Sequence, residues 1–340
     1  GQDNIPIKVS VKNYDSVSAS LTDLTPTFSL GNYTLSVPVP SLPDTINAGV
    51  EKEYVFNVNV ADNSLTGTAT IDANATATIG TQFSDLDADI KDYWEVLRKA
   101  ELSIAHIDAL PLTVTKGQTV TVWMTIDNTG GTPFEIATAS LNIKPGSYTV
   151  TLDPSVIGTI VAPGMSFPAK FTVKIELDSD SGVATLNGAA TGTNVLSLKE
   201  TGTSTAIIQD TWTVQNPPEL VIQSVVASDT VYRGQTGIPV FLNIINVGEA
   251  LAYWNSSKLW FSWGSYDDPP EAKNSFPIDV YGGLSSIAEY WVNVREDSAT
   301  GTSDVDASIV FTDSNSGDVY DDPLFRALFP ASWLIIGEKI

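Results

Sequence analysis

Apolar residues recur at every second position in many short segments of this chain. Between residues 119 and 128, for example, the apolar side chains are Val120, Val122, Met124 and Ile126. A period of two residues is typical of a β-strand that buries one face. Gly, Pro, Asn and Asp separate these segments along the whole chain, and these residues favour turns. The pattern predicts an all-β protein made of immunoglobulin-like antiparallel β-sandwiches.

The alternating pattern begins in the same way three times. Each time a Gly-Gln pair precedes an alternating run that ends at Asn-x-Gly or Asn-x-Asp, and the pairs start at residues 1, 117 and 234. Later in each repeat, a segment around Trp94 matches one around Trp212, and Asp322-Pro323-Leu324 takes that place in the third repeat. Ordered landmarks at one spacing indicate homologous units. We therefore predict three tandem modules over residues 1–98, 99–216 and 217–330.

The segment around Trp94 allows two interpretations. Ile90, Tyr93, Trp94 and Leu97 recur at helical spacing, which favours a short helix. The matching segment around Trp212 lies among Thr and Val, which favours a strand. Because homologous positions share structure, we predict a strand at Trp94, with the helix as the alternative.

The motifs resemble those of a known family. A strand that follows Gly-Gln and ends at Asn-x-Gly, with a later Asp-Ser…Gly turn, is similar to the CARDB-type immunoglobulin-like repeats of bacterial and archaeal cell-surface proteins. This resemblance implies an extracellular spacer or adhesive role without catalysis. It transfers no functional residues, because the matched positions are structural.

The two ends of the chain differ from an ordinary tandem array. The second and third modules have an apolar strand before their Gly-Gln pair, whereas the first begins directly at Gly1-Gln2. The last residues, 331–340, align with the opening strands of modules 2 and 3, so they are predicted to be a donor strand. The alternative is that the sequence is a slice of a longer tandem array, in which case its two ends have no such meaning. Its anchoring residues are Trp333, Leu334, Ile335 and Ile336. The acceptor is the first strand of module 1, with Ile5, Ile7, Val9 and Val11.

Charge and composition exclude several functions. With 17 basic and 40 acidic residues the chain has a net charge of −23, which disfavours nucleic acids and anionic membrane surfaces as partners. There is no cysteine and one histidine, so thiolate and multi-histidine metal sites are excluded. No run of apolar residues approaches the length of a transmembrane helix, so no membrane insertion is expected.

Few residues are candidates for chemistry. His106 lies in an alternating strand, and its counterpart in the next module is Ser224, so we interpret it as a surface strand residue and predict no enzyme. Asp85, Asp87 and Asp89 alternate near the first module junction, and closely spaced carboxylates suit Ca²⁺. A calcium site there is one hypothesis, and acidic turns on an acidic protein are the other. No further cofactor is expected.

Two other sets of residues are candidates for surface contacts. Asn32, Asn74 and Asn255 each lie in an Asn-x-Ser/Thr sequence, which permits N-glycosylation in an exported protein. The third module concentrates aromatic residues, among them Trp254, Trp260 and Trp263. One interpretation is that one face of this segment is core and the other contacts a neighbouring module or subunit, and the alternative is that these rings stack on a sugar.

These expectations combine into one functional hypothesis. The chain is predicted to be a structural subunit of an extracellular filament, whose partners are copies of itself. Each copy would donate its C-terminal strand to the first module of the next, head to tail. The alternative is an adhesin or carbohydrate-binding array within a larger cell-surface protein.

Overall fold

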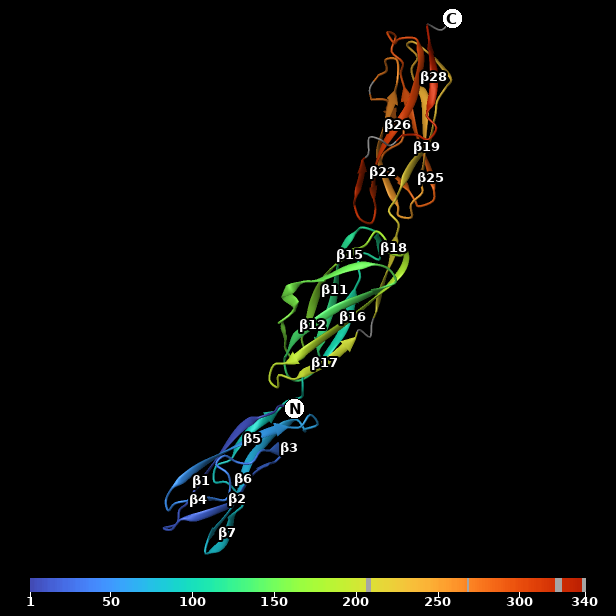
Figure 1. The fold of residues 1–340 in the computed structure, drawn as a ribbon. Helices are drawn as coiled ribbons and strands as arrows, with labels where there is room; N and C mark the ends of the chain where they lie inside the picture. Colours follow the sequence, from blue (N-terminus) through green and yellow to red (C-terminus); the bar gives the residue numbers. More distant parts are fainter. Residues whose placement is uncertain (206–208, 268, 322–325, 338–340) are drawn as a thin grey trace.

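The computed structural model describes residues 1–205, 209–267, 269–321 and 326–337. In this part of the chain the strands form six sheets, which lie in three pairs, one pair after another (Figure 1). The predicted all-β sandwich class is confirmed. The three sandwiches, called modules 1 to 3 below, follow one another end to end, and the last described strand, Ala331–Ile336, lies in the module farthest from module 1 (Figure 1).

Module 2 shows the complete set of strands. One sheet has the order β13-β15-β11-β9, and the other has the order β10-β18-β16-β12-β14 with β17 beside β16. The inward side chains of both sheets form one core, in which Met124, Ile126 and Trp212 are almost fully buried. Its strands are β9 (Leu102–Asp108), β10 (Thr113–Thr115), β11 (Thr119–Asn128), β12 (Phe134–Lys144), β13 (Tyr148–Leu152), β14 (Ile160–Val161), β15 (Ser166–Ile175), β16 (Gly182–Asn194), β17 (Glu200–Thr205) and β18 (Asp210–Gln215), with a 3₁₀ turn at Pro154–Val156.

Module 3 repeats this topology. Its sheets have the orders β23-β25-β21-β19 and β20-β28-β26-β22-β24, with β27 beside β26. In both modules the opening strand (β9 or β19) borders the first sheet, and a short second strand (β10 or β20) runs parallel to the last strand of the second sheet. The strands are β19 (Leu220–Val226), β20 (Thr230–Tyr232), β21 (Ile238–Asn246), β22 (Ala252–Phe261), β23 (Glu271–Ala272), β24 (Ile278–Val280), β25 (Ser285–Val292), β26 (Gly301–Asp313), β27 (Val319–Asp321) and β28 (Ala331–Ile336).

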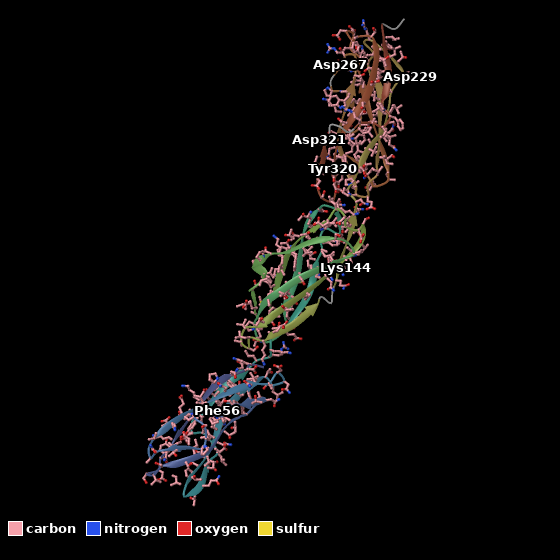
Figure 2. All side chains as sticks on the ribbon, in the orientation of Figure 1. Phe56, Lys144, Asp229, Asp267, Tyr320 and Asp321 are labelled. Carbon is pink, nitrogen blue, oxygen red and sulfur yellow. The ribbon has the colours of Figure 1, made fainter. Side chains whose placement is uncertain are left out.

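Module 1 has a smaller set of strands. Its sheets have the orders β3-β5-β1 and β4-β2-β6-β7, with β8 paired to β6. Among the described residues it has no counterpart of the opening strand or of the short second strand. The buried centre includes Phe56, labelled in Figure 2. The strands are β1 (Ile5–Lys12), β2 (Ala19–Phe28), β3 (Tyr33–Leu35), β4 (Asp44–Ile46), β5 (Glu51–Val60), β6 (Gly67–Ile79), β7 (Thr81–Asp85) and β8 (Asp92–Val96).

The prediction that residues 331–340 form a free donor strand is wrong for the part that the structure describes. β28 is the last strand of module 3, antiparallel to β26 and parallel to β20. Trp333 and Ile335 are each 1% exposed in the core of their own module, whereas Leu334 and Ile336 face outward. The segment therefore aligns with β18 and β8, not with the opening strands. Residues 322–325 and 338–340 lie outside the described residues.

The tryptophan environments show why this alignment is the correct one. Trp333 Nε1 donates to Tyr266 Oη at 2.9 Å, and its ring lies 5.7 Å from that of Phe261. In module 1, Trp94 donates in the same way to a tyrosine hydroxyl, at 3.2 Å, and stacks on a phenylalanine. Trp94 lies in β8, so the predicted strand is confirmed and the helical alternative is wrong.

Candidate functional site: an open sheet edge in module 1

Strand β1 has a hydrogen-bonded neighbour on one side, β5. Its counterparts β11 and β21 each lie between two strands, because β9 and β19 border them on the other side. The Asn13 N–H donates to Val50 O at 3.0 Å. In an antiparallel pair, the backbone N–H and C=O groups of every second residue point toward the same neighbour, so those of every second residue before Asn13 also point toward β5. The backbone groups of Lys8, Ser10 and Lys12 therefore face the other side, which we call the open edge.

The inward side chains of β1 are only half-buried. Ile5, Ile7, Val9 and Val11 point toward the core but remain partly accessible. In module 2 the corresponding side chains of β11 are 0% to 7% exposed. The acceptor residues predicted from sequence thus line the interior next to the open edge, and they are the apolar surface that an added strand would cover.

A conserved arrangement of hydrogen bonds shows where such a strand would begin. The side chain of Asn246 donates to Ala250 O at 2.8 Å and Val280 O at 3.0 Å, and its Oδ1 accepts from the Glu219 N–H of the opening strand segment at 3.0 Å. Asn13 makes the same two donor contacts, at 2.8 and 3.0 Å. Among the described residues, no N–H of an opening strand donates to Asn13 Oδ1. The sequence pattern did not reveal that the asparagine of the Asn-x-Gly motif holds the opening strand in this way.

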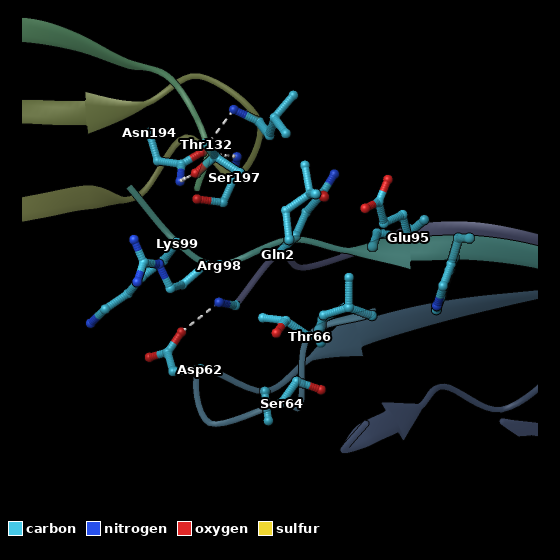
Figure 3. A pocket seen from close by; sticks show the side chains of 18 residues that line it. Gln2, Asp62, Ser64, Thr66, Glu95, Arg98, Lys99, Thr132, Asn194 and Ser197 are labelled. Carbon is cyan, nitrogen blue, oxygen red and sulfur yellow. Dashed lines mark hydrogen bonds and ion pairs between the residues drawn. The ribbon is translucent and has the colours of Figure 1, made fainter. Parts of the chain in front are cut away.

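A cavity of about 370 Å³ lies beside the start of β1, between module 1 and module 2 (Figure 3). In modules 2 and 3 the corresponding place is filled by the short second strand, whose Val114 and Val231 are each 0% exposed. We call this cavity the second-strand slot. It is lined by Gly1, Gln2, Ile5, Val60, Ala61, Asp62, Ser64, Thr66, Trp94, Glu95, Val96, Leu97, Arg98, Lys99, Thr132, Asn194, Leu196 and Ser197.

The backbone around Gln2 confirms that the slot is equivalent. Val60 N–H donates to Gln2 O at 2.8 Å, Ile175 N–H donates to Gln118 O at 2.9 Å, and Val294 N–H donates to the matching glutamine, also at 2.8 Å. In modules 2 and 3 the short second strand leads directly into this Gly-Gln turn. The open edge and the slot therefore correspond to the places that the opening strand and the short second strand occupy in modules 2 and 3.

The structure does not bring the predicted calcium ligands together. Asp87 pairs with Lys91, which also lies 2.8 Å from Asp72 Oδ2. The hydrogen bond from Lys91 lowers the pKa of Asp72 far below its usual range. In the described part of the chain no cluster of three or more acidic or histidine side chains could hold a metal ion, so Asp85, Asp87 and Asp89 do not form a ligand set.

The predicted aromatic site is wrong in part. Trp254 is 0% exposed and belongs to the core of module 3, so it cannot stack on a ligand. Trp260 is exposed, but Lys258 Nζ lies 4.3 Å from its ring centre and the guanidinium of Arg326 lies 5.3 Å from it. Trp263 is about half exposed, and its Nε1 donates to Thr300 O at 3.3 Å. The three residues do not form a common platform.

The remaining candidates occupy different surroundings. Asn32 is exposed, Asn74 is half-buried in β6, and the half-buried Asn255 donates through Nδ2 to Thr312 Oγ1 at 2.7 Å. N-glycosylation of these residues stays a prediction. His106 is exposed on β9.

Comparisons with known proteins give only distant likenesses. No family model matches the chain, and no curated protein matches it. Among solved structures it is similar to FdeC, an Escherichia coli adhesin, with 12% identity over 98% of this chain and 97% of that one and a TM-score of 0.35. The D00-D0 domain of intimin matches with 10% identity over 69% and 99% and a TM-score of 0.25. The Yersinia pseudotuberculosis adhesin InvE matches with 12% identity over 69% and 58% and a TM-score of 0.21.

Likenesses at this level do not define a family, and the CARDB resemblance stays a prediction. None of the described helical residues forms a helix long and apolar enough to cross a membrane. The function has to be argued from the acceptor site itself.

Proposed function

We propose that the chain is a structural, non-catalytic subunit at the cell surface, and that copies of it join head to tail into an extracellular filament. In each joint, an extended segment of one copy adds to the open edge of module 1 in the next. The observation that carries this proposal is that, within the residues that the structure describes, β1 is paired on one side, whereas β11 and β21 are paired on both.

Two properties of the molecule support strand addition between copies. An unpaired strand edge beside half-buried apolar side chains is a template for another strand. The modules are arranged end to end, so an interface at the module 1 end extends the array along its length (Figure 1).

The donor differs from the one that the sequence predicts. Because β28 is an integral strand of module 3, residues 331–336 are not free to be donated. Both opening strands of the described chain, β9 and β19, are likewise paired in their own modules. The donor we propose is therefore an extended segment that has no place in its own copy and that follows the pattern of the opening strands, which place Leu102 and Ile104 opposite Asn128 and Ile126.

Assembly of the purified chain tests the proposal. Light scattering and electron micrographs at rising concentration should show end-to-end oligomers. Ser10→Pro removes an N–H that faces the open edge and leaves the bonds to β5 in place, so it should abolish oligomers. Ser10→Ala is the matched control and should assemble as the unmodified chain does.

Two outcomes would refute this proposal. One is a chain that stays monomeric at every concentration. The other is a Ser10→Pro variant that is folded by circular dichroism and still assembles like Ser10→Ala, since assembly would then use another surface.

A further inference from the structure

The sheet β23-β25-β21-β19 of module 3 has an apolar surface on its outward side. Side chains alternate between the core and this side along each strand, so Phe241 and Ile245 point outward between fully buried neighbours. Ile287, on β25, is 56% exposed there. We call this outward surface the apolar face, and its main members are Val221, Val226, Phe241, Ile245, Ile287 and Trp291.

The segment before β28 extends the apolar face beyond β19. Val225 N–H donates to Phe329 O at 3.0 Å, so this segment runs beside β19. Phe329 lies opposite Ser224 in the pairing, and Ser224 lies opposite the outward-facing Asn243. The side chain of Phe329, which is 72% exposed, therefore lies on the same side of the sheet as the apolar face.

Module 2 shows that the fold does not require apolar residues at these places. Its equivalent sheet has the same topology, so each residue of the apolar face has a counterpart there. The counterparts are Ser103, Asp108, Trp123, Asp127, Pro168 and Thr172. Only Trp123 and Pro168 among them are apolar. Since the solvent side of such a sheet ordinarily carries polar residues, the apolar face of module 3 indicates a contact with a partner.

The polar groups within the apolar face are paired with one another. Asn243 Nδ2 donates to Ser224 Oγ at 2.9 Å. Glu289 Oε2 accepts from Lys273 Nζ at 2.8 Å, and its Oε1 accepts from Trp291 Nε1 at 3.2 Å. These pairs leave the middle of the face without net charge and with few polar groups for the hydroxyl groups of a sugar. The chemistry of the face therefore suits an apolar, uncharged partner surface.

We propose that the apolar face binds the same face of a second copy, so that two chains pair side by side through their third modules. Two sheet faces pack about 10 Å apart with interdigitating side chains, and a flat apolar face is complementary to itself in this way. An interface that uses the same patch on both copies closes into a dimer. Each chain has a net charge of −23, and its uncharged face is where two copies approach with little repulsion. The contact does not involve the open edge of module 1, so it is independent of the proposed function.

The size of the apolar face determines the strength of this contact. Four strands about 4.8 Å apart and about seven residues long cover roughly 450 Å² on each copy. A dimer would bury about twice that area, which is less than the roughly 1,200 Å² of stable interfaces and typical of weak, reversible contacts. We therefore expect a dimer that forms at high protein concentration and dissociates on dilution.

Sedimentation of the full chain at rising concentration tests the proposal. Ile287→Asp places a charge in the middle of the apolar face and should weaken the dimer by about tenfold or more. Leu334→Asp is the matched control, because Leu334 is 45% exposed on the other sheet of module 3 and the change in charge is the same. Added salt should strengthen the dimer, since it screens the repulsion between acidic copies and leaves the apolar contact in place.

A spin label on Ser285→Cys separates side-by-side pairing from head-to-tail assembly. The chain has no cysteine, and Ser285 is exposed at the start of β25. Paired third modules bring the two labels close together, whereas head-to-tail copies keep them a full chain length apart. A short label-to-label distance should appear at high concentration, persist with Leu334→Asp and with Ser10→Pro, and disappear with Ile287→Asp.

Three results would overturn the inference. One is the absence of the short distance at every concentration, and another is its persistence in Ile287→Asp that is folded by circular dichroism. If Ile287→Asp does not fold, Phe329→Ser, which changes a side chain outside the regular strands, replaces it in the same test. The third is binding of polysaccharides or phosphatidylcholine vesicles that Ile287→Asp abolishes in a chain without the short distance, since the face would then serve another partner. End-to-end oligomers that remain in any of these cases leave the proposed function standing.

Discussion

The assignment of β28 to module 3 makes a quantitative prediction about two adjacent residues. Ile335 is 1% exposed and Leu334 is 45% exposed, although both are large aliphatic residues of one strand. Removing the buried side chain of Ile335 leaves a cavity, and such a change to alanine costs about 2–5 kcal/mol. Leu334→Ala removes a side chain at the surface, where substitutions change stability by about 0.5 kcal/mol or less.

The effect should be visible in melting and in hydrogen exchange. For a module of this size a loss of about 3 kcal/mol lowers the melting temperature by about 10–15 °C. Hydrogen exchange followed by mass spectrometry should show the loss of protection in β26 and β28, with β16 and β18 of module 2 as an internal reference. Leu334→Ala should exchange like the unmodified chain.

A free donor strand would behave differently. Ile335→Ala would then leave the stability of module 3 unchanged and would weaken association between copies instead. Equal protection of β26 in the two variants would therefore refute the assignment of β28 to its own module.

Three other expectations concern modules 1 and 3. The Ser10 amide faces the open edge, so it should exchange at least about 100-fold faster than the Thr125 amide at the matching place in module 2; equal protection would contradict a free edge. Asn246→Ala should destabilise module 3 by about 2–4 kcal/mol in denaturant melts, because it leaves several buried backbone groups without partners, and a loss near zero would contradict this. The hydrogen bond from Lys52 lowers the pKa of Asp44. The stabilisation from ionised Asp44 is therefore present above the pKa of this carboxyl in the unfolded chain, and it is lost as pH falls through the lower pKa in the folded protein. Asp44→Asn should therefore reduce the fall of the melting temperature at acid pH. An unchanged fall would contradict the contribution of Asp44 to stability.

The strands could be predicted from sequence because their signal is local. Alternation of apolar residues depends only on the two-residue period of a strand with one buried face, and the three Gly-Gln runs correspond to β1, β11 and β21. The strand at Trp94 could be predicted for a related reason: its homologue at Trp212 carries a β-type pattern that overrides the helical spacing.

The place of the last strand could not be predicted as easily. The connection before it differs in length between modules: β17 ends at Thr205 and β18 begins at Asp210, whereas β27 ends at Asp321 and β28 begins at Ala331. The match placed at Asp322 lies 112 residues after Asp210, whereas Asp210 lies 118 residues after Asp92, and this choice leaves Trp333 as an apparent extra strand. Trp333 lies 121 residues after Trp212, close to the 118 residues between Trp94 and Trp212. The buried tryptophan contacts correct this, but contacts between distant residues are not visible in a pattern.

The second-strand slot was missed for a similar reason. The short second strand has three residues in module 2, too few to show a period, and its importance lies in one buried valine and one contact across a junction. Sequence indicated that module 1 begins without an opening strand. It did not indicate that the short second strand of module 2 contacts the hairpin of module 3.

An energetic comparison also restricts what the donor can be. If β28 moved from its own module into module 1 of another copy, the gain from covering β1 would be offset by exposing Trp333 and Ile335 and the strands beside them. The resident β28 also competes from within the same chain, at an effective concentration of about a millimolar or more. Exchange of this strand therefore has no driving force at ordinary concentrations. A segment that completes module 1 must have no equivalent place in its own copy, and the open edge favours such a segment because binding there buries apolar surface without opening another module.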